Sequence, residues 1–201
     1  NAKIISYDLT KDQSWHPDIE ALEQLDLSQV KLMGINYPNM PTGSPADRRK
    51  LSELIQFAQR HEILLVNDNP YSMVLTDEKF SILQLEGAEE VCLELNSLSK
   101  SFNLAGFRVG FLVGNPDFIS AVLKVKSNMD SGMFYPIQKA AAQALKLDID
   151  WFESQNKIYS ARRAIIWELC KALQLSVDKN TNGLFVWAKI NTHHTAEELA
   201  D

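Results

Sequence analysis

The chain has 201 residues, of which 45% are apolar and 23% charged, and its 20 basic and 26 acidic residues give a net charge of −6. This composition lies close to the soluble globular average, which excludes disordered, collagen-like and coiled-coil proteins. The acidic balance and the lack of an apolar run of about 20 residues lead us to expect no nucleic-acid partner and no membrane segment.

Four short apolar runs predict buried strands. They cover residues 30–36, 63–67, 91–95 and 108–113. Between the first two runs, apolar residues recur at helical spacing from Leu51 to Ala58, with Ser44 as the predicted cap and Pro45 in the first turn. Strand, helix and strand in this order form a βαβ unit, so we predict an α/β fold with a three-layer, mostly parallel sheet and flanking helices.

Beyond residue 113 the pattern becomes helical. Asn115-Pro116 predicts the start of one helix, Pro136 predicts the start of another that runs to Leu147, and a long amphipathic segment covers about residues 150–175. The sequence NGLFVWAKI at residues 182–190 predicts a return to strand.

These elements indicate three parts. We expect a cofactor-binding large domain at residues 3–150, incomplete at its amino-terminal side, a connecting helix at 151–175 and the beginning of a small domain at 176–201.

Polar residues follow three of the predicted strands, where open parallel sheets bind their ligands. The first strand leads into YPNMPTG (residues 37–43), the second into DNPY (68–71) and the third into NSLSK (96–100). Arg108 follows eight residues after Lys100. Each residue alone is usually a turn, cap or surface residue, but their positions at successive strand ends make them a candidate site.

This set suits a small molecule with a phosphate, a basic ring nitrogen and an electrophilic carbonyl. Pyridoxal 5′-phosphate has all three features. Arg108 and Ser97 would hold the phosphate, Asp68 would stabilise the protonated ring nitrogen, and Lys100 would form a Schiff base.

The stretch SLSKSFNLAGFRVG (residues 97–110) resembles the lysine signature of the class I/II aminotransferases, which are fold-type I pyridoxal-phosphate enzymes. In that signature a Ser three residues before the Lys and an Arg eight residues after it bind the phosphate. NDNPY (67–71) resembles the family's Asp-x-x-Tyr segment, and YPNMPTG resembles its Asn-Pro-Thr-Gly turn. The matches run in the family's order across about residues 30–190.

One position departs from the family pattern. The Asn that donates to the phenolic oxygen of the cofactor stands immediately before Pro-Thr-Gly, and here that residue is Met40, which donates no hydrogen bond. Either Asn39 or Tyr71 supplies the donor alone, or the phenolate is less stabilised and the Schiff-base pKa is raised. Asn39 is therefore a secondary cofactor-binding candidate.

The resemblance implies an enzyme that transfers an amino group between an amino acid and a 2-oxoacid. Lys100 would be covalent anchor and general acid/base, Asp68 would keep the cofactor ring protonated, and Tyr71 would bond its phenolic oxygen. It also implies a homodimer in the full-length protein. The family's phosphate loop, its ring-stacking aromatic and its carboxylate-binding Arg would lie outside these residues, so we expect little or no activity from this chain alone.

Two other functions remain open. A carbon–sulfur β-lyase or a decarboxylase shares the same lysine segment, and an aminotransferase-like domain can serve as the effector-sensing module of a transcriptional regulator. His193-His194 lacks further ligands at metal-binding spacing, so no metal site is expected. Cys92 and Cys170 lie in apolar patterns typical of buried thiols in a reducing compartment, which favours a cytoplasmic location.

Overall fold

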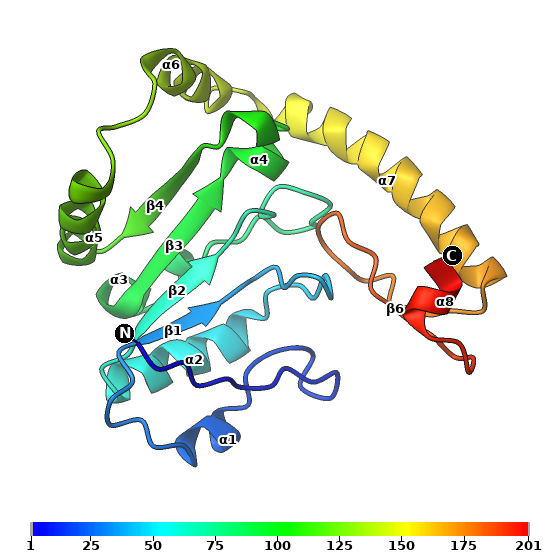
Figure 1. Cartoon of the computed structure of the whole chain (residues 1–201), viewed down its shortest axis with the longest axis horizontal. Coiled ribbons are helices and arrows are strands. Elements are labelled where there is room, and N and C mark those ends of the chain that lie inside the picture. Colours follow the sequence, from blue (N-terminus) through cyan, green and yellow to red (C-terminus); the bar gives the residue numbers. More distant parts are fainter. Residues whose placement is uncertain (1, 201) are drawn as a thin grey trace.

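The computed structural model describes residues 2–200 and contains one four-stranded sheet in the order β1-β2-β3-β4. The strands are β1 (Leu32–Ile35), β2 (Leu64–Asp68), β3 (Cys92–Ser97) and β4 (Gly110–Gly114). The first three run parallel, and β4 runs antiparallel to β3 with Ser97 opposite Gly110 (Figure 1). The prediction of a mostly parallel sheet with flanking helices is confirmed.

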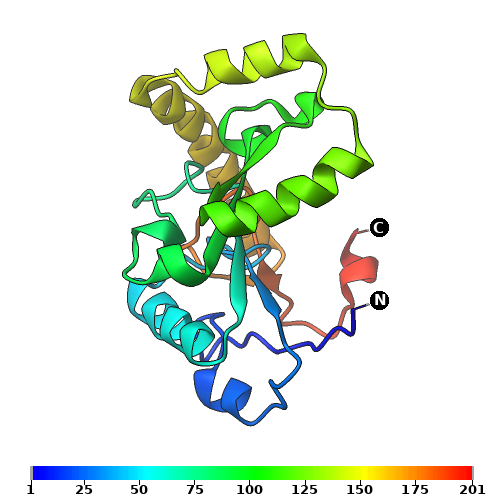
Figure 2. The ribbon, with the colours of Figure 1, turned by 90° about the vertical axis from the view of Figure 1, so that its left-hand side faces the viewer.

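Eight α-helices surround or follow this sheet in the described residues. They are α1 (Ile19–Glu23), α2 (Arg48–Arg60), α3 (Ala88–Val91), α4 (Leu98–Ser101), α5 (Pro116–Met129), α6 (Tyr135–Ala144), α7 (Ile149–Ala172) and α8 (Ala196–Ala200). Short 3-10 turns lie at Ile82–Gln84 and Ala105–Phe107. Figures 1 and 2 place α1 and α2 at the β1 end of the sheet and α5 and α6 at the β4 end.

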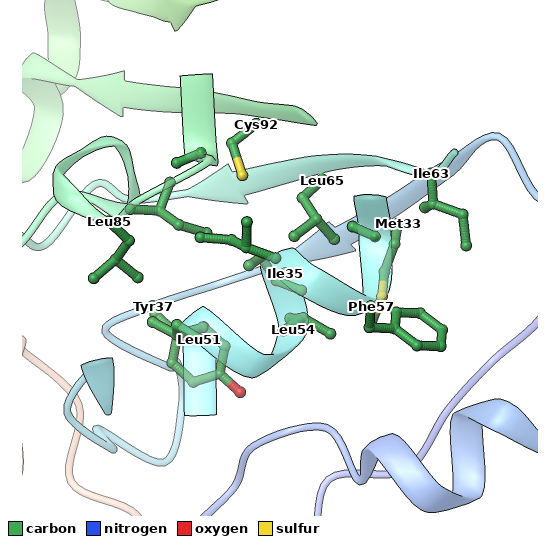
Figure 3. Close-up of a cluster of buried hydrophobic side chains, with 14 of the residues drawn as sticks. Met33, Ile35, Tyr37, Leu51, Leu54, Phe57, Ile63, Leu65, Leu85 and Cys92 are labelled. Atoms are coloured by element: carbon green, nitrogen blue, oxygen red, sulfur yellow. The ribbon is translucent and has the colours of Figure 1, made fainter. Parts of the chain in front are cut away.

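The hydrophobic core lies between α2 and one face of the sheet (Figure 3). Alternate strand residues face this helix because side chains in a strand point to opposite sides in turn. The core side chains from helix and sheet include Met33, Ile35, Leu51, Leu54, Ile55, Phe57, Leu65 and Cys92. Each fully buried side chain of this kind stabilises the fold by about 1.5–3 kcal/mol.

The helix α2 begins later than predicted. Its cap is Asp47, whose carboxylate accepts hydrogen bonds from the backbone N–H groups of Arg49 and Lys50. The prediction of Ser44 as cap is wrong because the Ser44 hydroxyl instead donates to the Ser14 carbonyl at 2.8 Å. The predicted start of α5 is confirmed, since Asn115 accepts from the backbone of Asp117 there.

The other face of the sheet is partly open within residues 2–200. Leu32 of β1 is 57% exposed and Leu95 of β3 is 41% exposed. Apolar side chains of α5 are exposed as well, with Met129 at 78%. No helix in this described part is long and apolar enough to cross a membrane.

The carboxyl-terminal region differs from its prediction. The long helix α7 is present, but the predicted strand at residues 182–190 is reduced to β6 (Ala188–Lys189), which pairs with β5 (Ser176–Val177). Residues 182–187 instead form an irregular segment with a left-handed glycine at Gly183. The division of the chain into three parts stays a prediction.

Candidate active site

The carboxyl ends of β1, β2 and β3 lie at one edge of the sheet (Figure 1). Asp68 at the end of β2 lies beside Leu95 of β3 in the parallel register. The Asn36 amide donates to the Asp68 carbonyl at 2.5 Å, and the Ser101 hydroxyl donates to the Pro70 carbonyl at 3.2 Å. These contacts bring the segments after the three strands together, as the sequence predicts.

Asp68 and Tyr71 supply an anion and a phenol. Asp68 is partly exposed, yet burial of its carboxyl raises its pKa, and it forms no ion pair within residues 2–200. Tyr71 is buried, and burial together with the charge of Asp68 raises its pKa. The Tyr71 hydroxyl therefore keeps its proton at neutral pH, and a cation placed beside Asp68 gains from its poorly solvated charge.

Lys100 lies in α4, the short helix that begins directly after β3. The Ser97 hydroxyl caps this helix by accepting from the backbone of Ser99 at 3.1 Å, and Leu98 is fully buried beneath it. Lys100 itself is half-buried, and across residues 2–200 its amine has neither an ion-pair nor a hydrogen-bond partner. The capped helix α4 thus presents an amine that no other group in the described residues binds.

Arg108 stands in the left-handed region with φ 54°. Its Nη1 donates to the Ala105 carbonyl at 3.0 Å and lies 3.5 Å from the Ser99 hydroxyl, and its guanidinium is exposed. A non-glycine residue in this region costs about 1–3 kcal/mol, and such strain concentrates at functional sites. The strained turn brings the guanidinium back over α4.

Asn39 and Met40 occupy the turn after β1. The Asn39 side chain is buried and bonds within this turn, accepting from Thr42 at 2.5 Å and donating to the Asn36 carbonyl at 3.3 Å. The Met40 thioether packs against Gly183. The Asn39 and Met40 side chains therefore both contact other parts of this protein.

The structure adds residues that sequence reasoning did not single out. Asn36 bridges two site segments, because its amide also accepts from the Met40 backbone N–H at 2.7 Å while donating to Asp68. Ser99, rather than Ser97, lies next to the Arg108 guanidinium. Ser99 follows directly from the Ser-x-Ser-Lys pattern, whereas the role of Asn36 depends on contacts between distant segments.

The chemistry of this set fits pyridoxal 5′-phosphate. Lys100, Arg108 and Asp68 take part in no ion pair with any residue from 2 to 200. Arg108 with the serine hydroxyls matches a phosphate, Asp68 matches a protonated ring nitrogen, and an amine matches an aldehyde. Unpaired charges of both signs at one sheet edge are what a zwitterionic ligand requires.

Two open cavities lie elsewhere. One, of about 470 Å³, is lined by Lys31, Ile63 and Val91 at the amino ends of the strands. The other, of about 270 Å³, lies between α1 and the start of α2. Neither is lined by the candidate residues.

Comparison with known sequences gives consistent matches. The family model "Aminotransferase class I and II" matches residues 1–201. The LL-diaminopimelate aminotransferase of Natranaerobius thermophilus is 39% identical over 187 residues, which cover 92% of this chain and 48% of that protein. The LL-diaminopimelate aminotransferase of Gloeobacter violaceus is 40% identical over 176 residues, covering 87% of this chain and 45% of that protein.

Solved structures agree with these sequence matches. Apo-BacF from Bacillus subtilis matches 97% of this chain and 50% of its own with a TM-score of 0.88 and 37% identity. A probable N-succinyldiaminopimelate aminotransferase from Thermus thermophilus matches 90% of this chain and 50% of its own with a TM-score of 0.82 and 31% identity. The chain spans about half the length of the curated relatives that it matches.

Proposed function

Since this chain belongs to the aminotransferase class I and II family, we propose that it is the lysine-bearing part of an enzyme that transfers an amino group between an amino acid and a 2-oxoacid. The family depends on pyridoxal 5′-phosphate. The observation that carries the proposal is the Lys100 amine, which has no partner among residues 2–200 and lies between Ser97 and Arg108 in sequence, on a turn tied to the Asp68 segment.

Each group has a chemical role in this proposal. When bound, the cofactor supplies an aldehyde for amino groups and a ring that withdraws electrons from the substrate's α-carbon. Lys100 would hold the cofactor covalently, and its free Nζ would move a proton at the substrate's α-carbon. The Asp68 carboxylate would keep a proton on the ring nitrogen, and the Arg108 guanidinium with the Ser97 and Ser99 hydroxyls would bind the phosphate.

Tyr71 would donate a hydrogen bond to the phenolic oxygen of the cofactor. Its raised pKa keeps the hydroxyl protonated, and the Asn39 amide is already bonded inside its own turn. Met40 offers no donor. One donor in place of two would stabilise the phenolate less.

The remaining expectations concern the whole protein. We propose amino acid and 2-oxoacid substrates, a cytoplasmic homodimer, and no nucleic-acid or membrane partner. Because this chain spans half the length of its relatives, we expect residues 1–201 alone to bind the cofactor weakly and to turn over little or no substrate.

The test uses the complete protein that contains these residues. We expect loading with pyridoxal 5′-phosphate, borohydride reduction and peptide mass spectrometry to locate the cofactor on Lys100. The Lys100→Ala variant should retain none, whereas Lys146→Ala, which removes an exposed lysine on the α6–α7 connection, should retain it fully. Cofactor trapped in Lys100→Ala would contradict the assignment.

A panel of amino acids with pyruvate or 2-oxoglutarate then tests the reaction. Transamination forms one new amino acid for each 2-oxoacid produced. Release of ammonia or carbon dioxide without a new amino acid would instead identify a β-lyase or a decarboxylase.

A further inference from the structure

The segment at residues 181–185, here called the returning segment, lies against the loops after β1 and β2 (Figure 1). The backbone N–H of Asn182 donates to the Gly43 carbonyl at 2.7 Å, and that of Gly183 donates to the Val74 carbonyl at 2.9 Å. The returning segment is therefore bonded to the two loops that carry Met40 and Tyr71.

This contact requires a glycine on each side. Gly43 and Gly183 both have left-handed backbones, with φ 75° and 76°. A Cβ atom on Gly43 would lie 2.7 Å from the Thr181 Cβ, and one on Gly183 would lie 2.9 Å from the Met40 sulfur and 3.3 Å from the Tyr71 ring. A side chain on Gly43 would press against the backbone of the returning segment, and one on Gly183 would displace the end of the Met40 side chain.

Side chains of helix α7 bond both the returning segment and the loop after Tyr71. Arg163 donates to the Thr181 carbonyl at 2.6 Å. Asn156 accepts from the Leu75 backbone at 2.9 Å and donates to the Met73 carbonyl at 3.1 Å. The loop after Tyr71 is therefore tied both to α7 and to the returning segment, so their relative placement is well defined.

Met40 fills the space in this contact. Its sulfur and terminal methyl pack on Gly183, where a flexible thioether suits an irregular gap. The side chain that departs from the family pattern is thus used to seat the returning segment.

Phe185 follows two residues later and borders the candidate site. Its ring lies edge-on to the Tyr71 ring at 6.2 Å between centroids and 72°, and the residue is 47% exposed. The stretch NGLFVW from residue 182 contains no basic residue. Among residues 182–187, the wall beside Tyr71 therefore offers an open aromatic ring and no basic side chain, and the nearby Arg163 guanidinium is engaged with the Thr181 carbonyl.

We propose that Met40 is a positioning residue whose contact with Gly183 places Phe185 beside Tyr71, where the Phe185 ring contacts the substrate's side chain and favours apolar and aromatic amino acids over acidic ones. This inference rests on the proposed aminotransferase function.

Substrate preference of the complete protein provides the test. We expect a higher kcat/KM for L-phenylalanine than for L-aspartate, and Phe185→Ala should reduce that ratio about tenfold, which is the loss of roughly one aromatic contact. Gly183→Ala should produce a similar loss, mainly as a raised KM for phenylalanine. Adding Met40→Ala to Gly183→Ala removes the steric conflict and should restore part of the ratio.

Gly87→Ala is the matched control. Gly87 has the same left-handed backbone, at φ 77°, but an added Cβ there would meet only the flexible Gln59 side chain, away from the site. This variant carries the backbone strain alone and should leave the ratio unchanged.

The equilibrium Kd values of two unreactive carboxylates, 3-phenylpropionate and succinate, measure the side-chain preference of the site without turnover. Tighter binding of 3-phenylpropionate that weakens in Phe185→Ala is expected. The proposal is overturned if the wild type prefers aspartate and succinate, or if the variants change both substrates equally. If the wild type transaminates nothing, the aminotransferase function itself has failed, which is a different result.

Discussion

Replacing Asn67 with leucine removes the buried side chain that joins β1 to β2 and β3 beneath the candidate site. Its Oδ1 accepts from the Tyr37 backbone N–H at 2.9 Å, and its Nδ2 donates to the Tyr37 carbonyl at 3.2 Å and to Glu94 Oε2 at 3.1 Å. Leucine has a similar volume but forms none of these bonds. The substitution therefore tests hydrogen bonding with little change in packing.

We expect Asn67→Leu to lower the free energy of unfolding by about 4 kcal/mol. This sum takes about 1 kcal/mol for each bond to the Tyr37 backbone and about 2 kcal/mol for the bond to the carboxylate. Urea denaturation of the complete protein, followed by circular dichroism, measures it. Asn128→Leu is the control because the Asn128 amide bonds the Lys124 carbonyl on an exposed helix surface, where the change should stay below about 0.5 kcal/mol.

The double variant Asn67→Leu/Glu94→Leu tests whether the Asn67 bond to the Glu94 carboxylate contributes to the loss of stability. The buried Glu94 carboxylate also accepts from the Ile82 backbone at 2.9 Å and from the Asn96 amide at 3.1 Å. Because Asn67→Leu alone leaves this buried charge with fewer donors, the double variant should cost less than the sum of the two single variants. A loss below about 1 kcal/mol for Asn67→Leu, or strict additivity, would refute the argument.

Two further predictions concern strain and pH. Arg108→Gly should raise the free energy of unfolding of the cofactor-free protein by about 1 kcal/mol, because glycine adopts the left-handed backbone without strain. The same variant should bind pyridoxal phosphate more weakly in an absorbance titration. A lower free energy of unfolding would show that the Arg108 backbone is not strained. His16 is buried with its Nδ1 against the Ser14 carbonyl and its Nε2 accepting from the Asp47 backbone, and burial lowers its pKa, so the unfolded chain binds a proton more readily. Stability should therefore fall as pH drops below about 6.5, urea midpoints at several pH values should record this, and His16→Gln should flatten the slope.

Much of the fold was predictable because buried strands and amphipathic helices leave strong local patterns. The four apolar runs correspond to β1–β4 with small shifts at their ends. The direction of β4 was not predictable, since a short apolar run reads the same in either orientation. The local Ser-Pro pattern predicts Ser44 as the cap of α2, and this fails because the Ser44 hydroxyl bonds Ser14, a partner 30 residues away that local reasoning does not see.

In the candidate site, too, local sequence patterns were predictable and contacts between distant segments were not. The Ser97, Lys100 and Arg108 spacing was visible because these residues lie in one continuous segment. The segment at residues 182–187 was interpreted as strand because Phe, Val and Trp favour strands. In the structure, its backbone hydrogen bonds instead go to Gly43 and Val74, and such long-range contacts leave no periodic signal.

Two of the candidate groups, Asp68 and Lys100, each stand next to a buried polar residue that bonds to a neighbouring segment. Partly exposed Asp68 follows Asn67, which is fully buried, and half-buried Lys100 precedes Ser101, which is 7% exposed. This alternation is what a strand end or a short turn imposes, because successive side chains point in different directions. Substitution of Asn67 or Ser101 should therefore displace the functional neighbour without removing any reacting group.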